Sequence, residues 1–135
     1  MCIRDRVQVS SAGQAPIDFD DVMLERSYSG VQAYCQSKLA QIMFALDLAA
    51  ELEGSGVSST ALHPATYMPT KIVPSPTGSL NEGTEATFRL VADPGLDGVS
   101  GAYFNVTSEQ AAHPQAYDDD ARRRLRELSA RLTGV

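Results

Sequence analysis

Apolar positions in the first half of the chain follow two periods, one typical of a strand and one typical of a helix. Residues 7–9 form a short apolar run that gives way to the small residues 10–13, which predicts a buried strand followed by a turn. Between residues 30 and 52 apolar side chains recur at helical spacing, and neither proline nor glycine interrupts the pattern after its first residue. This segment predicts one long helix, which Gly54 and Gly56 end.

The second half of the chain continues to alternate strand and helix. Residues 57–62 alternate small and branched side chains, and Pro64 stops this strand because proline has no N–H to donate. A helix over residues 81–92, a strand over 102–106 and a last helix from about Pro114 complete the pattern. We expect the last helix to bury three leucines, Leu125, Leu128 and Leu132. The order predicts the α/β class, with a doubly wound parallel sheet in a three-layer α/β/α arrangement.

One connection is too long to be a simple turn. The segment from residue 65 to residue 80 contains three prolines, which favours a binding loop or lid. Its apolar side chains Met68, Ile72 and Val73 either line an apolar substrate pocket or anchor the loop, and both roles stay open.

Length, charge and cysteine content narrow the function classes. With 135 residues the chain amounts to one domain, long enough to bury a core. Eleven basic against seventeen acidic side chains give a net charge of −6, which argues against a nucleic-acid-binding domain. The most apolar stretch, residues 42–50, contains an aspartate and is too short for a membrane span. Because Cys2, Cys35, His63 and His113 suggest neither a disulfide framework nor a metal site, we expect a cytoplasmic, metal-free protein.

The first six residues, MCIRDR, differ in character from the rest of the chain. They lack the apolar stretch of a secretory signal, and they resemble the translated end of a transposon adapter used in preparing sequencing libraries. We expect residues 1–6 to be non-native, residues 7–135 to form the domain, and the natural protein to continue upstream. The alternative is a genuine charged N-terminus.

A tyrosine and a lysine define the first candidate site. Tyr34 and Lys38 stand four residues apart on the predicted helix, so both project from one face. A cation within about 4–6 Å of a phenol favours the phenolate, and such a phenol can exchange a proton with an alcohol or a carbonyl. Ser10 and Ser11 come directly after the first strand, and ligands of open α/β sheets bind at the carboxyl ends of strands. A tyrosine and a lysine at this spacing often occur by chance, and the two serines strengthen the interpretation of this pair as a site.

Three motifs together carry a resemblance to a known family. VSSAG at residues 9–13, YCQSKLA at 34–40 and LHPATYMPT at 62–70 resemble the short-chain dehydrogenase/reductase family in order and spacing. Two further segments, 17–21 and 124–129, resemble its retinol-dehydrogenase-like branch. The resemblance covers residues 7–135 and implies that they are the C-terminal, catalytic part of a Rossmann-like domain.

The resemblance implies a role for each motif residue. Tyr34 would be the general acid/base, and Lys38 would promote its ionisation and bond the nicotinamide ribose. Ser11 would hydrogen-bond the substrate oxygen, with Ser10 as the second candidate.

The proline-containing turn would contact the cofactor and the substrate. The cofactor-binding residues implied are Tyr34, Lys38, Pro64, Ala65, Thr66 and Thr70, and those for the substrate are Ser11, Met68 and Ile72. Ala65 stands where the family commonly has glycine, and Thr70 lies one residue further along than usual.

The implied activity is an NAD(P)-dependent oxidoreductase that moves a hydride between nicotinamide and a small-molecule alcohol or carbonyl. The family's glycine-rich dinucleotide turn and the asparagine of its proton relay would lie upstream of Val7, so we expect this chain to be inactive alone. NAD and NADP both stay open, as does a homo-oligomer. The alternative is a non-catalytic fragment or binding module that cannot hold a dinucleotide. A Ser/His/Asp hydrolase is disfavoured because Ser11 lacks the glycine two residues earlier that a nucleophile elbow requires.

Overall fold

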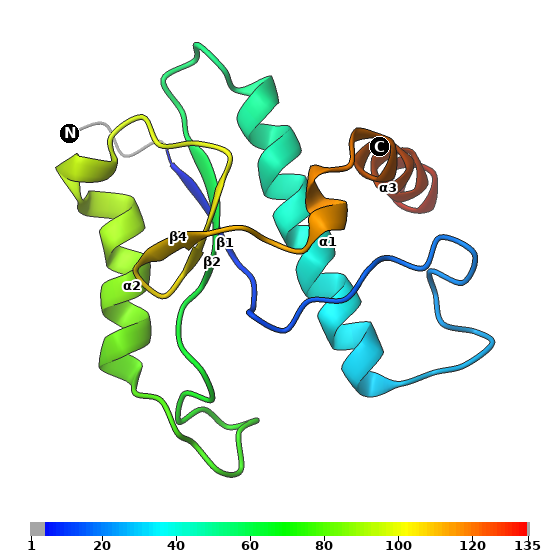
Figure 1. Cartoon of the computed structure of the whole chain (residues 1–135), viewed down its shortest axis with the longest axis horizontal. Helices are drawn as coiled ribbons and strands as arrows, with labels where there is room; N and C mark the ends of the chain where they lie inside the picture. Colours follow the sequence, from blue (N-terminus) through cyan, green and yellow to red (C-terminus); the bar gives the residue numbers. More distant parts are fainter. Residues whose placement is uncertain (1–4, 135) are drawn as a thin grey trace.

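The computed structural model describes residues 5–134 and contains a four-stranded sheet in the order β1-β2-β3-β4 (Figure 1). The strands are β1 (Arg6–Val9), β2 (Ser59–His63), β3 (Ala102–Asn105) and β4 (Ser108–Gln110). The first three are parallel, and β4 runs antiparallel to β3. The carboxyl ends of three strands therefore lie along one edge, where a ligand site of an open α/β sheet is expected.

Three α-helices and two 3-10 helices complete the fold. They are α1 (Gly30–Glu51), α2 (Leu80–Ala92), η1 (Pro94–Leu96), η2 (Pro114–Tyr117) and α3 (Asp119–Thr133). A polar residue caps each α-helix at its start: Ser29, Ser79 and Asp118 accept backbone N–H groups of the first turns. Such caps fix where each helix begins.

The helices α1 and α2 cover opposite faces of the sheet, as Figure 1 shows. Ala61 and Tyr103 pack in one core cluster with α1, whereas the alternate strand residues Leu62 and Phe104 pack in a second cluster with α2. This confirms the predicted α/β class with helices on both faces. Because the strand order advances steadily from β1 to β3 while the helices change face, the two crossovers have opposite hands, a departure from the usual right-handed rule.

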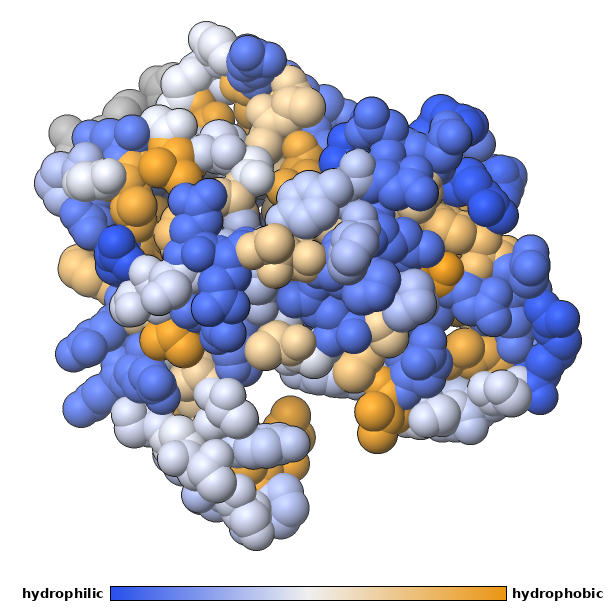
Figure 2. Space-filling view, viewed as in Figure 1, coloured by the Kyte–Doolittle hydropathy of each residue, from blue (hydrophilic) through white to orange (hydrophobic). Residues whose placement is uncertain are grey.

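The last helix differs from its prediction. Pro114 opens η2, and α3 begins only at Asp119, where Asp118 caps it. Leu125 and Leu128 are half-buried and Leu132 is 62% exposed, so the expected burial is wrong for Leu132. The physical reason is that polar contacts fasten α3 to α1: Arg122 Nε lies 2.8 Å from Asp47 Oδ1, and Arg126 pairs with Glu51. Figure 2 shows the α3 side of the molecule as mostly hydrophilic.

The first strand begins one residue before the predicted apolar run. Arg6 opens β1 and pairs with Ser59, and Asp5 accepts a hydrogen bond of 2.6 Å from Ser58 Oγ. The non-native origin of residues 1–6 stays a prediction, and residues 1–4 lie outside the described residues. None of the helices within 5–134 combines the length and the apolar character needed to cross a membrane.

Candidate active site

The two serines after β1 have different environments. Ser10 Oγ donates a hydrogen bond of 2.7 Å to the carbonyl of Lys38, and its backbone N–H donates to the carbonyl of Leu62. This hydroxyl thus fastens the end of β1 to α1. The hydroxyl hydrogen of Ser10 is thus already donated, and the role of Ser11 toward a substrate stays a prediction.

Ser11 and Tyr34 border one small space above Gly13. Ser11 Oγ accepts a hydrogen bond of 3.0 Å from the N–H of Gly13. A Cβ atom built on Gly13 would lie 3.5 Å from Ser11 Oγ, 3.7 Å from Tyr34 Cε1 and 3.4 Å from Cys35 Sγ. Since glycine has no side chain, a space of about one methyl group remains beside the hydroxyl and the phenol ring. The structure therefore brings Ser11, after β1, close to Tyr34 on α1.

Lys38 lies one turn of α1 beyond Tyr34, on the same face. Its Nζ is 5.6 Å from the centroid of the Tyr34 ring, and Tyr34 itself is half-exposed. Nζ donates to the carbonyl of Val9 at 3.3 Å and to Gln41 Oε1 at 3.0 Å. An ammonium group has three donors, so one N–H has no acceptor among the described residues and can bond a ligand.

The turn after β2 reaches the same edge of the sheet. Val9 at the end of β1 pairs with Leu62 of β2, so the residues that come after each strand are neighbours. Pro64 and Ala65 are buried, whereas Thr66 and Thr70 are exposed. His63 Nε2 lies 3.0 Å from Thr66 Oγ1. Burial lowers the pKa of His63, and the carboxylate of Glu82 partly opposes that shift.

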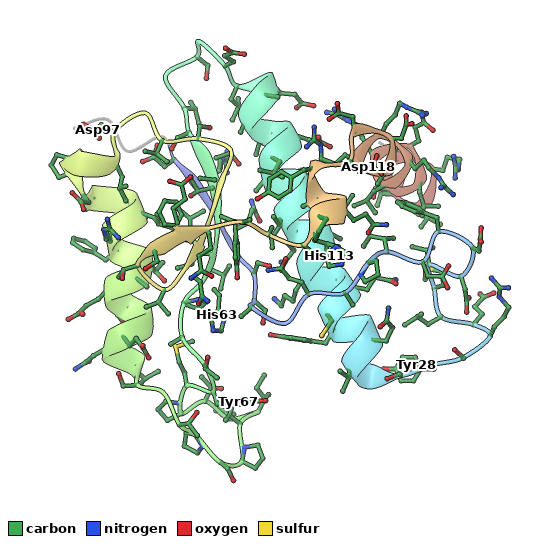
Figure 3. All side chains as sticks on the ribbon, in the orientation of Figure 1. Tyr28, His63, Tyr67, Asp97, His113 and Asp118 are labelled. Atoms are coloured by element: carbon green, nitrogen blue, oxygen red, sulfur yellow. The ribbon has the colours of Figure 1, made fainter. Side chains whose placement is uncertain are left out.

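The long loop carries its apolar residues in two directions. Met68 Sδ occupies the space beside Gly83 of α2, so this side chain anchors the loop to the helix. Ile72 is 89% exposed. The loop, which carries Tyr67, extends below His63 in Figure 3, and Figure 2 shows a notch between this lobe and the body of the molecule. The position of Met68 favours the anchoring role, and a substrate contact of Ile72 stays a prediction.

Two hollows in the described structure lie away from these residues. One of about 880 Å³ lies at the opposite end of the sheet, beside Gly54, Ser58 and Gly101, and one of about 270 Å³ lies between α1 and α3. Neither is lined by Ser11, Tyr34 or Lys38. Because the chemically competent side chains converge elsewhere, we assign the site to the open edge and not to a hollow.

Two residues that the sequence did not single out hold Ser11 from behind. Tyr103 OH and Gln14 Nε2 each donate a hydrogen bond of 3.1 Å to the carbonyl of Ser11. Gln14 Oε1 in turn accepts a bond of 2.7 Å from the N–H of His113. The only sequence signal was a phenol within an apolar strand, since a buried tyrosine usually needs a hydrogen-bond partner.

The amino-acid sequence of this chain is similar to those of known proteins. No family model matches the chain. Retinol dehydrogenase 13 of Homo sapiens is 37% identical over 88% of this chain and 42% of its own length, and retinol dehydrogenase 14 of Homo sapiens is 32% identical over 88% and 40%. The chain thus spans about two fifths of the length of these relatives.

Solved structures agree with the fold. A crystal structure of an uncharacterized protein from Mycobacterium Paratuberculosis matches 97% of this chain and 51% of its own, with a TM-score of 0.73 and 25% identity. The NADPH-bound carbonyl reductase from chicken fatty liver matches 81% and 42%, with a TM-score of 0.59 and 21% identity, which is evidence for the fold alone. Its retinol dehydrogenase relatives and its fold confirm the resemblance to the short-chain dehydrogenase/reductase family that the three motifs predict.

Proposed function

We propose that the protein containing this chain is an NAD(P)-dependent oxidoreductase that interconverts an alcohol and a carbonyl. The names of its relatives, the retinol dehydrogenases, support this class of reaction. The single observation that carries the proposal is the convergence of Ser11 Oγ and the Tyr34 ring on the space above Gly13, with the Lys38 ammonium 5.6 Å from that ring.

The geometry suits a proton transfer coupled to hydride transfer. A bound nicotinamide dinucleotide would supply the hydride acceptor for alcohol oxidation and the hydride donor for the reverse reaction. In alcohol oxidation Tyr34 would take the proton of the alcohol oxygen, and in carbonyl reduction it would give a proton to the carbonyl oxygen. Ser11 would donate a hydrogen bond to that oxygen, and the Lys38 ammonium lies 5.6 Å from the centroid of the Tyr34 ring.

The described residues fit the nicotinamide end of such a cofactor. The remaining N–H of Lys38 suits a ribose hydroxyl, and the turn of Pro64, Ala65, Thr66 and Thr70 comes after the neighbouring strand. The pyrophosphate end needs a glycine-rich turn between a strand and the start of a helix. Within 5–134 the nearest glycine pair, Gly54 and Gly56, comes after α1 and precedes β2, so it is the wrong context. We therefore propose that this chain alone is inactive.

The test is Tyr34→Phe in the full-length protein. The variant keeps the ring and loses the acid, so turnover should fall by roughly 10²- to 10⁴-fold while dinucleotide affinity changes little. Tyr28→Phe is the matched control, because Tyr28 is 78% exposed in the segment before α1 and has no proposed role. Unchanged turnover in Tyr34→Phe would exclude Tyr34 as the general acid/base.

A further inference from the structure

We propose that Tyr103 and Gln14 are positioning residues that orient Ser11 by holding its carbonyl oxygen. The inference rests on the proposed function, because it gives Ser11 the task of binding the substrate oxygen. It adds a second layer of residues behind the site, drawn from β3 and from the turn after β1.

Two donors meet on one acceptor. Tyr103 OH and Gln14 Nε2 both lie 3.1 Å from the Ser11 carbonyl oxygen. Tyr103 is 3% exposed and Ser11 is 6% exposed, so water has little access to replace either bond. Burial also raises the pKa of Tyr103, which keeps its hydroxyl protonated and donating at ordinary pH.

The hold on the carbonyl determines where the hydroxyl lies. Both donors fix the peptide plane that begins at Ser11, and the N–H of Gly13, two residues later, donates to Ser11 Oγ at 3.0 Å. A serine turned at its carbonyl would move its hydroxyl away from the space shared with Tyr34. Such misplacement is costly, since a shift of about 1 Å can lower a rate by roughly 10²-fold.

The anchor extends to a distant part of the chain. Gln14 Oε1 accepts the N–H of His113 at 2.7 Å, and Gln115 bonds both the N–H and the carbonyl of Ile17, at 2.6 and 3.2 Å. The turn that carries Ser11 is thus fixed against residues about one hundred positions later. In Figure 3 His113 is seen over α1, near the path of this early segment.

The experiment is Tyr103→Phe in the full-length enzyme, assayed with saturating dinucleotide. We expect kcat to fall roughly 5- to 20-fold, as for the loss of one orienting hydrogen bond, with unchanged dinucleotide affinity. Tyr117→Phe is the matched control, because its hydroxyl also bonds a backbone group, the N–H of Ala112 at 2.9 Å, but does not contact Ser11. That variant should keep its kcat.

The decisive readout is the effect of Tyr103→Phe in a Ser11→Ala background. A positioning residue has nothing left to orient there, so kcat should fall no further; an equal fall in both backgrounds would overturn the inference. Gln14→Met should repeat this pattern, and it serves if Tyr103→Phe does not fold. Full activity of Ser11→Ala and Tyr34→Phe would instead refute the proposed function, whereas loss in those two and none in Tyr103→Phe and Gln14→Met would refute the positioning role alone.

Discussion

At the scale of single residues, a substitution of Gly13 should lower activity without lowering stability. Every contact that an added Cβ would make there is 3.4 Å or longer, so Gly13→Ala fits without displacing a neighbour. Its methyl group would nevertheless fill the space between Ser11 Oγ and the Tyr34 ring. We expect at least about a 10-fold loss of turnover, since reacting groups tolerate little misplacement, and a nearly unchanged unfolding midpoint, measured on the full-length protein.

A second glycine provides the opposite control. Gly56 has a φ of +76° and nothing within 4 Å of an added Cβ, so Gly56→Ala meets no neighbour but is strained. It should lower the free energy of unfolding by about 1–2 kcal/mol and leave turnover unchanged. If Gly13→Ala instead lost stability and kept full turnover, the space above Gly13 would not be the reaction site.

His63 should make stability depend on pH. Burial lowers its pKa below the ordinary value of 6.5 despite the opposing charge of Glu82. The unfolded chain then binds more protons than the folded chain as pH falls from about 6.5 toward the lower folded pKa. The contribution of His63 to stability is therefore full above about pH 6.5 and is lost below it. Denaturant unfolding of the wild type and of His63→Gln at about pH 7.5 and 5.5 checks this, and the wild type should lose more.

At the scale of elements, α3 shows how charge replaces apolar packing. The Arg122–Asp47 pair joins α3 to α1 with both side chains about one fifth exposed, at 22% and 23%. A double-mutant cycle with Arg122→Gln and Asp47→Asn should give a coupling free energy of about 1 kcal/mol that falls as salt is added. The Arg123–Asp120 pair, at 59% and 82% exposed, should give a few tenths. Equal coupling in the two pairs would contradict the role of Arg122.

Local patterns predicted the elements whose signal is local. The strands and helices from β1 to β3 arise from apolar period, prolines and caps, and the three motifs placed Ser11, Tyr34 and Lys38 at one edge of the sheet. The sequence did not predict the strand β4, because its residues Ser108–Gln110 are all polar and give no apolar period. They are exposed, as suits a short protective edge strand. The spacing of the leucines in α3 predicts that they share one helix face, but it does not predict which element packs against that face.

The residues behind the site could not be read from the sequence for another reason. Tyr103 meets the Ser11 carbonyl across 92 positions, and His113 meets Gln14 across 99. Such contacts depend on the order and register of strands, which no local pattern contains. The turn chemistry at VSSAG predicted where the serine lies, and only the tertiary structure shows what holds it.

At the scale of the whole molecule, the described structure exposes an unpaired sheet edge and apolar side chains on two helices. In the described structure β1 pairs only with β2, which leaves its other edge without a strand, and Val9 is 48% exposed there. Phe44 on α1 and Phe88 on α2 are 54% and 68% exposed. An open edge and apolar helix faces favour association with other chains, so we expect the 135-residue chain to self-associate in sedimentation experiments.

The residues at the candidate site predict weak dinucleotide binding by this chain. Tyr34, Lys38 and the Pro64 turn reach only the nicotinamide end of a dinucleotide, while the pyrophosphate normally rests on backbone amides at the start of a helix that comes after a glycine-rich turn. Losing that anchor removes the strongest electrostatic contact, and we expect dissociation constants no tighter than about millimolar for NADH and NADPH, some 4 kcal/mol weaker than a micromolar complex. Calorimetric titration of the purified chain measures this directly. A monomeric chain that binds either dinucleotide at micromolar concentration would show that these residues suffice.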